Sequence, residues 1–300
     1  MTSPESRRLA EQLRDLPATA GLDLGEWRGR AAAGASRPLP DEFDHVATDA
    51  GGVESEWAWF GERIDVADGP VVMFLHGGGF VVCDISTHRL LAARIADAAG
   101  HGSSLVVGYR RAPEDVFPAA VVDSATAYRW LLSQGVRPGR IVIAGDSAGG
   151  NLTFACAVAL RDAGDPLPAA LVAISPWTDL SLGADSLTRL REVDPFAHLD
   201  DLPRMRDLYL DGGDPAQPLA SPLFAELDGL PPTLVVVGDT ETLLDDSTRI
   251  VERAASAGVD VTLEIVAGAF HTWMNHVGEL PEADEALALI GRFIARHVER

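Results

Sequence analysis

The chain has 300 residues, 47% of them hydrophobic, which is enough to bury the core of one large α/β domain. Its formal net charge of −21 argues against binding to nucleic acid, to anionic membranes and to polyanionic substrates. The chain contains no lysine, which excludes Schiff-base and Ser-Lys catalysis, and its two cysteines are too few for a disulfide scaffold or a zinc cage.

Residues 1–45 open with a charged amphipathic stretch and show little strand signal. This stretch lacks the apolar core of a signal peptide, and no apolar run in the sequence reaches the length of a membrane span. We therefore expect a cytoplasmic protein with no membrane insertion. We expect residues 1–45 to form helices, which belong either to a cap or to an excursion that does not contact the substrate.

Strand and helix patterns alternate along the rest of the chain, which predicts a mostly parallel sheet with helices on both faces. The strand patterns cover residues 55–60, 71–76, 103–108, 140–145, 169–175, 233–238 and 260–266. The helical patterns cover residues 86–100, 120–134, 149–163, 242–257 and 282–298. The polar residues 178–218 interrupt this order of strands and helices. They form either a cap insertion over a substrate site or a helical excursion that does not contact the substrate. The α/β domain then comprises residues 46–177 and 219–300.

A run of three glycines follows the strand pattern at 71–76, in the order His76-Gly77-Gly78-Gly79-Phe80. Successive glycines let the backbone approach a ligand closely and turn its N–H groups inward. The run lacks the Gly-Lys-Ser/Thr of a phosphate loop and the Gly-x-Gly-x-x-Gly of a dinucleotide loop. It predicts either a structural turn or an oxyanion hole, in which the amides of Gly78 and Gly79 join that of Ala148.

A second glycine-flanked turn, Gly145-Asp146-Ser147-Ala148-Gly149, joins the strand pattern at 140–145 to the next helix. Neighbours without Cβ atoms are needed where strand and helix backbones nearly touch. Such a turn lifts the Ser147 hydroxyl beside the first amides of the helix, where a nucleophile belongs if an oxyanion forms next to it. The alternative is an ordinary glycine-rich turn with a capping serine.

A serine nucleophile needs a base, and His271 is the best placed of the eight histidines. It follows the last strand pattern on a loop, at the same sheet edge as Ser147. His276 is the nearby alternative. A carboxylate must then fix the tautomer of the imidazole and stabilise its charged form.

Three acids on the segment after 233–238 are candidates for that carboxylate. We favour Glu241, with Asp245 second and Asp239 third. Asp245 has a strong structural alternative, because acids favour helix N-termini. The chain order is then nucleophile, acid, base.

These motifs together resemble the bacterial hormone-sensitive-lipase-like esterases, whose serine lies in a Gly-Asp-Ser-Ala-Gly sequence. The resemblance covers about residues 70 to 300. It is carried by His76–Gly79, Tyr109–Glu114, Gly145–Asn151, Ser221–Phe224 and Gly229–Thr233. It implies an α/β-hydrolase fold with a mostly parallel eight-stranded sheet, flanking helices and a small helical cap.

The resemblance also implies that Ser147 is the nucleophile and His271 the base, with Glu241 at a position where the family usually has aspartate. It implies a carboxylesterase that forms an acyl-enzyme on small or short-acyl esters, with no metal or organic cofactor, and a possible homodimer. A lactonase, amidase or acyltransferase would use the same triad, and a non-catalytic small-molecule receptor is the alternative of another class. The candidate pocket residues are Phe80, Phe196, Leu208, Tyr209 and Trp273.

Overall fold

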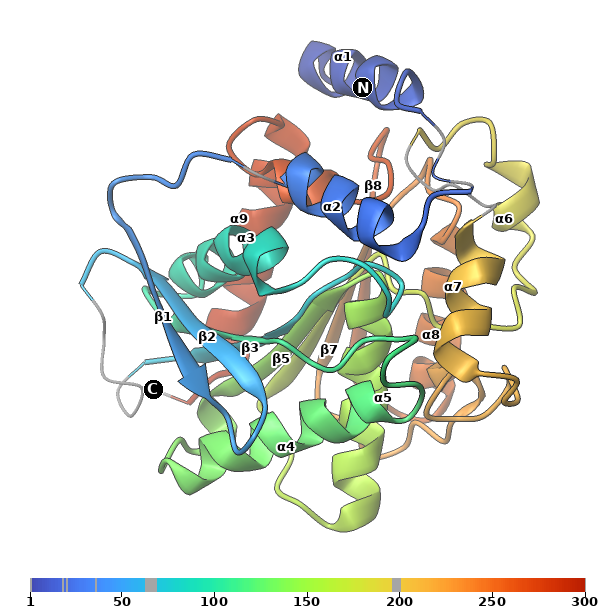
Figure 1. Cartoon of the computed structure of the whole chain (residues 1–300). Coiled ribbons are helices and arrows are strands. Elements are labelled where there is room, and N and C mark those ends of the chain that lie inside the picture. Colours follow the sequence, from blue (N-terminus) through green and yellow to red (C-terminus); the bar gives the residue numbers. More distant parts are fainter. Residues whose placement is uncertain are drawn as a thin grey trace.

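The computed structural model describes residues 2–17, 19, 21–35, 37–62, 69–195 and 201–299. These residues include a central eight-stranded sheet in the order β1-β2-β4-β3-β5-β6-β7-β8 (Figure 1). Only the β1-β2 and β2-β4 pairs are antiparallel. The α/β-hydrolase fold with a mostly parallel eight-stranded sheet is therefore confirmed. The strands are β1 (Phe43–Asp49), β2 (Glu54–Phe60), β3 (Val71–Leu75), β4 (Ser103–Val107), β5 (Ile141–Asp146), β6 (Ala170–Ile174), β7 (Thr233–Gly238) and β8 (Val261–Val266).

Strand β1 corrects the boundary at residue 45, because its first three residues fall in the range that we expected to form cap helices. It begins at Phe43, and Phe43 is its only buried side chain. An edge strand with polar residues on both faces has no alternating hydrophobic pattern, so its sequence does not predict a strand. The other seven strands lie within two residues of the expected positions.

Helices cover both faces of the sheet because its inner strands are apolar on both faces. In β3, for example, Met73 belongs to the hydrophobic core under α4, α5 and α8, whereas Phe74 belongs to the core under α3 and α9. The helices are α1 (Pro4–Arg14), α2 (Leu24–Ala35), α3 (Ile85–Ala98), α4 (Ala119–Ser133), α5 (Ala148–Ala163), α6 (Ser186–Arg189), α7 (Asp201–Leu210), α8 (Leu244–Ser256) and α9 (Pro281–His297). None of the helices in the described ranges has the length and hydrophobicity needed to cross a bilayer.

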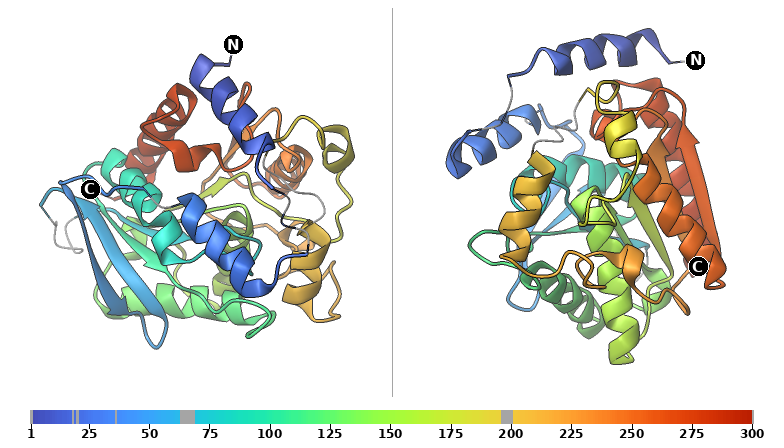
Figure 2. Two further views of the ribbon diagram at one scale, coloured as in Figure 1. Left: turned by 45° about the horizontal axis from the view of Figure 1, so that its top comes forward. Right: turned by 90° about the vertical axis from the view of Figure 1, so that its right-hand side faces the viewer.

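The N-terminal helices lie against the segment between β6 and β7, and Figure 2 shows α2 beside α7. The Arg204 guanidinium stacks 4.5 Å from the ring centroid of Trp27. The Thr19 hydroxyl donates to the buried carboxylate of Asp201. Residues 1–45 and 178–218, which are far apart in sequence, therefore share an interface.

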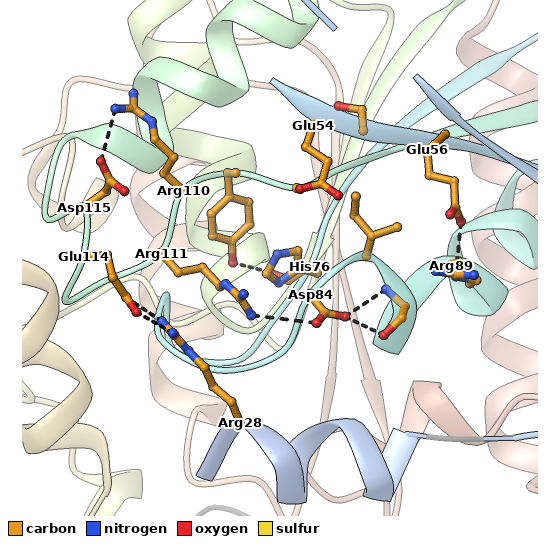
Figure 3. A pocket seen from close by; sticks show the side chains of 16 residues that line it. Arg28, Glu54, Glu56, His76, Asp84, Arg89, Arg110, Arg111, Glu114 and Asp115 are labelled. Atoms are coloured by element: carbon orange, nitrogen blue, oxygen red, sulfur yellow. Dashed lines mark hydrogen bonds and ion pairs between the residues drawn. The ribbon is translucent and has the colours of Figure 1, made fainter. Parts of the chain in front are cut away.

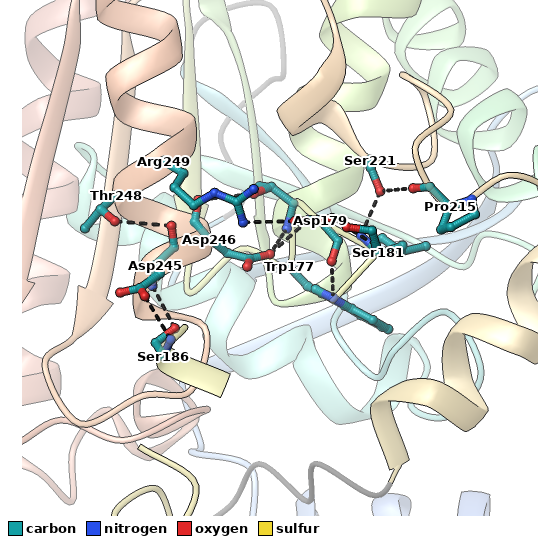
Figure 4. A network of polar contacts seen from close by, with 12 residues as sticks. Trp177, Asp179, Ser181, Ser186, Pro215, Ser221, Asp245, Asp246, Thr248 and Arg249 are labelled. Atoms are coloured by element: carbon teal, nitrogen blue, oxygen red, sulfur yellow. Dashed lines mark hydrogen bonds and ion pairs between the residues drawn. The ribbon is translucent and has the colours of Figure 1, made fainter. Parts of the chain in front are cut away.

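Buried carboxylates tie the start of this segment to α8 (Figure 4). Asp246 Oδ2 accepts the backbone N–H groups of Thr178, at 2.8 Å, and of Asp179, at 2.9 Å. Asp179 in turn forms an ion pair of 2.9 Å with Arg249. Burial is the main cause that raises the pKa of Asp246 to about 7.

Replacement of Asp246 by asparagine is expected to change how the stability of the protein depends on pH. The pKa of Asp246 in the native state lies above its ordinary value of 3.8. Between pH 3.8 and about 7, the native state therefore holds a proton on Asp246 that the unfolded state has lost. The stability due to this group is full at low pH and is lost as pH rises towards about 7. Thermal melts at pH 5 and pH 8 should show that Asp246→Asn gains in Tm relative to wild type at pH 8. An equal difference at both pH values would contradict the raised pKa.

Candidate active site

Ser147 stands at the sharp turn between β5 and α5 with a φ of +55°, a left-handed conformation that strains a non-glycine residue. A Cβ atom on Gly149 would lie 1.8 Å from the carbonyl oxygen of Leu75, and one on Gly145 would lie 2.4 Å from the Gly149 oxygen. The Ser147 N–H donates to Ile174 O at 2.9 Å. Backbone contact therefore requires the two glycines and holds the serine at the sheet edge.

His271 reaches this serine from the loop after β8. Its Nε2 atom lies 3.0 Å from Ser147 Oγ, and its Nδ1 atom lies 3.0 Å from Glu241 Oε2. The structure therefore brings together the three residues that the sequence favoured. His276, the alternative base, instead places Nδ1 2.9 Å from Glu279 and 2.9 Å from Arg37.

Glu241 is completely buried, and hydrogen-bond donors surround its carboxylate. Oε1 accepts from the Ser175 hydroxyl at 2.7 Å, from Gly238 N–H at 2.7 Å and from Trp273 Nε1–H at 3.2 Å. These bonds leave Oε2 directed at His271. Sequence reasoning missed Ser175, whose only signal is a polar residue directly after the buried strand next to β5.

The other two candidate acids lie elsewhere. Asp245 accepts the N–H of Ser186 at 2.8 Å and pairs with Arg189 at 2.9 Å. Asp239 accepts the N–H of Gly268. Both side chains serve local structure around the ends of α6 and β8.

The surroundings of His271 change its affinity for a proton. Burial on its own lowers the pKa of an imidazole. The hydrogen bond and negative charge of Glu241, together with the charges of Asp194 and Asp146, outweigh burial and raise the pKa of His271. The ring is therefore a stronger proton acceptor than burial alone would leave it.

The glycine turn lies beside Ser147, because β3 and β5 are paired through Leu75 and Gly145. Gly78 has a φ of +104° and Gly79 a φ of +59°. Asp146 Oδ1 accepts the N–H of Gly77 at 2.9 Å, and Oδ2 lies 3.2 Å from His88 Nε2. Asp146 therefore ties the turn to β5, which is a structural role.

Ala148 completes the set of candidate oxyanion donors. It is the first residue of α5, so its N–H has no carbonyl partner within the helix. Met205 of α7 covers the neighbouring turn closely, since a Cβ atom on Gly79 would lie 2.0 Å from Met205 Sδ.

An aromatic cluster adjoins the turn. The rings of Phe80 and Tyr209 stack with centroids 3.9 Å apart, and Trp177 lies 6.0 Å from Phe80. Leu208 is partly buried against the same core. Of the remaining pocket candidates, Phe196 lies outside the described residues. Trp273 is buried under α9, where its Nε1–H group supports Glu241.

A separate polar cavity of about 580 Å³ lies between β2, the start of α3 and the loop after β4 (Figure 3). Its lining includes His76, Tyr109 and Arg111 but neither Ser147 nor His271. Burial, with the charge of His88, lowers the pKa of His76 to about 3, so the ring is neutral. Its Nδ1–H donates to Gly77 O at 2.8 Å. His76 therefore supports the glycine turn from outside the site.

Among the described residues, no group of three or more His, Cys, Asp or Glu side chains is arranged to hold a metal ion. The chemistry that the arrangement allows is proton transfer from a serine hydroxyl to an imidazole, which a buried carboxylate orients.

Comparison with known proteins gives consistent matches. A family model described as "alpha/beta hydrolase fold" matches residues 72–275. An acetyl-hydrolase of Streptomyces hygroscopicus is 46% identical over 227 residues, which are 76% of each protein. An esterase of Acinetobacter venetianus is 38% identical over 224 residues, which are 74% of each protein. A crystal structure of an esterase from the bacterial hormone-sensitive lipase family superposes with a TM-score of 0.95 at 42% identity, covering 100% of both chains.

Titration of His271 by NMR tests the pairing with Glu241. In Glu241→Gln the ring keeps the cost of burial but loses its negative partner, so its pKa should fall below the wild-type value. Asp245→Asn is the matched control and should leave this pKa unchanged, because Asp245 bonds to Ser186 and Arg189. The resonance is assigned by its loss in His271→Gln. Equal pKa values in Glu241→Gln and wild type would contradict the pairing.

Proposed function

Because the chain belongs to the bacterial hormone-sensitive-lipase family of α/β-hydrolase-fold esterases, we propose that Ser147, His271 and Glu241 form its catalytic triad. The chain is a carboxylesterase-type serine hydrolase. The observation that carries the residue assignment is the pair of 3.0 Å contacts that link the hydroxyl, the imidazole and the carboxylate.

In the proposed reaction, Ser147 Oγ attacks the ester carbonyl while His271 Nε2 takes the hydroxyl proton. The N–H groups of Gly78, Gly79 and Ala148 donate to the oxyanion of the tetrahedral intermediate. His271 then returns the proton to the leaving alcohol, and an acyl-enzyme remains on Ser147. A water molecule, deprotonated by His271, repeats these steps and releases the acid.

Glu241 has two tasks in this scheme. Its Oε2 accepts the Nδ1–H of His271, which leaves the Nε2 lone pair free to face Ser147. Its charge also stabilises the imidazolium that forms during each step. The three donors on Oε1 hold the carboxylate still, so that it orients the ring without moving itself.

Residues 1–42, which precede β1, and residues 178–218 act as a cap, and residues 43–177 and 219–300 form the catalytic domain. Support for this division comes from the shared interface of the two cap segments and from Met205, which reaches from α7 to Gly79. A cap over the glycine turn favours small substrates over a lipid interface. The homodimer and the cytoplasmic location remain predictions from the sequence. We expect two copies of the chain to pair through the edge strand β8, where Ile265 is 45% exposed.

The aromatic cluster of Phe80, Trp177 and Tyr209 limits the acyl chain to short lengths. All three side chains are at most 1% exposed, so the space beyond the glycine turn is filled. The name of the Streptomyces hygroscopicus relative, acetyl-hydrolase, agrees with a short acyl group. Esters with acyl groups of a few carbons are therefore the expected substrates.

Replacement of Ser147 by alanine tests the nucleophile. It should lower kcat for p-nitrophenyl acetate by at least about 10³-fold, because no hydroxyl remains to form the acyl-enzyme. Ser124→Ala is the matched control: Ser124 is a buried serine of α4 that donates to Ala120 O, and its loss should leave kcat within about twofold. Turnover by Ser147→Ala within about tenfold of wild type would rule out the assignment.

Replacement of Tyr209 by leucine tests the acyl-length limit. The smaller side chain opens space beside Phe80, so the ratio of kcat/KM for p-nitrophenyl octanoate to that for the butyrate should rise about tenfold. Tyr128→Leu controls for the loss of a buried tyrosine, because Tyr128 lies on α4 and donates to Pro166 O. A ratio that changes equally in both variants would show that Tyr209 does not set the limit.

A further inference from the structure

One carboxylate outside the proposed triad forms hydrogen bonds to two loops. One of these loops carries the acid of the triad, and the other carries the base. Asp194 follows α6 in the segment 178–218 and is 6% exposed. Its Oδ2 atom accepts the N–H of Thr242 at 2.9 Å and lies 3.2 Å from the Thr242 hydroxyl. Its Oδ1 atom accepts the N–H of His271 at 3.3 Å.

These bonds connect two loops that come from different strands. Thr242 follows Glu241 directly on the loop after β7, whereas His271 lies on the loop after β8. The contact between Glu241 and His271 therefore depends on how the two loop backbones sit relative to each other. A catalytic constellation tolerates errors of only about 0.5 Å, and a shared acceptor is a direct way to keep two backbones in register.

Asp194 also adds negative charge near the imidazole. Among the described residues, the charged groups that face His271 are Glu241 from the β7–α8 loop, Asp146 from the end of β5 and Asp194 from the segment 178–218, and each acts to raise its pKa against the effect of burial. Other ionisable groups on the flanking elements have partners of their own. These are Asp245 with Arg189, Asp239 with Gly268 and His276 with Glu279.

We propose that Asp194 is a positioning residue, through which the segment 178–218 holds the acid loop and the base loop in register. This proposal rests on the triad proposed above. Among the described residues, the hydrogen bonds of Asp194 reach none of the reacting atoms. It acts on the backbone of His271 and on the residue next to Glu241.

The variant Asp194→Asn removes the charge and one of the two oxygen acceptors. The loop of Thr242 or the loop of His271 then loses its hydrogen bond to residue 194. As a result, kcat for p-nitrophenyl acetate should fall by about 10- to 100-fold, while KM stays within about threefold. The acid limb of the pH profile of kcat/KM should move to lower pH, because the variant lacks one of the charges that raise the pKa of His271. A merely structural residue would not move this limb.

Asp179→Asn is the matched control. Asp179 is also a buried carboxylate of the segment 178–218, and its Oδ1 accepts the N–H of Ser181 while its Oδ2 pairs with Arg249. It has no hydrogen bond to either catalytic loop among the described residues. Its replacement should leave kcat and the acid limb at the wild-type position.

Each outcome decides for or against the proposal. A folded Asp194→Asn protein with wild-type kcat and an unmoved acid limb overturns it. If circular dichroism shows that this variant does not fold, Asp194→Glu replaces it. That variant keeps the charge but displaces it by one methylene, so a lower kcat with an unmoved limb supports the proposal and a wild-type kcat overturns it.

If neither variant folds, amide hydrogen exchange of the wild-type protein decides. The N–H groups of Thr242 and His271 bond to the two oxygens of one carboxylate and should be protected to a similar extent, whereas fast exchange of either one overturns the proposal. Labelling of wild-type protein and Ser147→Ala with a fluorophosphonate separates this result from failure of the triad itself. Equal labelling of the two proteins would overturn the triad, whatever Asp194 does.

Discussion

The close contact of β3, β5 and α5 fixes where every other group of the site must stand. Gly149 lies so near the carbonyl group of Leu75 that no side chain fits between them, and no side chain fits between Gly145 and Gly149 either. This contact forces the chain to reverse within one residue, and Ser147 takes the strained conformation that results. The interlocked backbones hold that strain, because relaxing the turn would separate the helix from the sheet.

The site is then completed from the carboxyl ends of neighbouring strands, which is where side chains on loops of a parallel sheet converge. His271 arrives from β8 and Glu241 from β7. The chain has a net charge of −21. The carboxylates near His271 differ from those on the surface because they are buried and accept hydrogen bonds from donors that are fixed in place. Glu241 receives hydrogen bonds at both oxygens and lies beside the ring, so its charge acts at short range in a medium that screens it little.

The segment 178–218 is more than a cover for the site. Asp246 of α8 anchors its start, and Met205 in α7 contacts the glycine turn. Between these two points, Asp194 bonds to both loops that carry the acid and the base. The segment thus touches both the glycine turn and the catalytic loops.

Elements that have a local steric or periodic cause can be predicted from the amino-acid sequence. Glycines two residues to each side of Ser147 predict the sharp turn, and apolar runs predict the inner strands, because each pattern reflects contacts of neighbouring residues. The edge strand β1 has a single buried side chain, Phe43, and left no such pattern. Which acid lies beside His271 depends instead on how distant segments pack together. Glu241 and Asp245 are four residues apart on one segment, and their separation in space depends on how the loop after β7 turns, which distant partners such as Ser175 and Asp194 set.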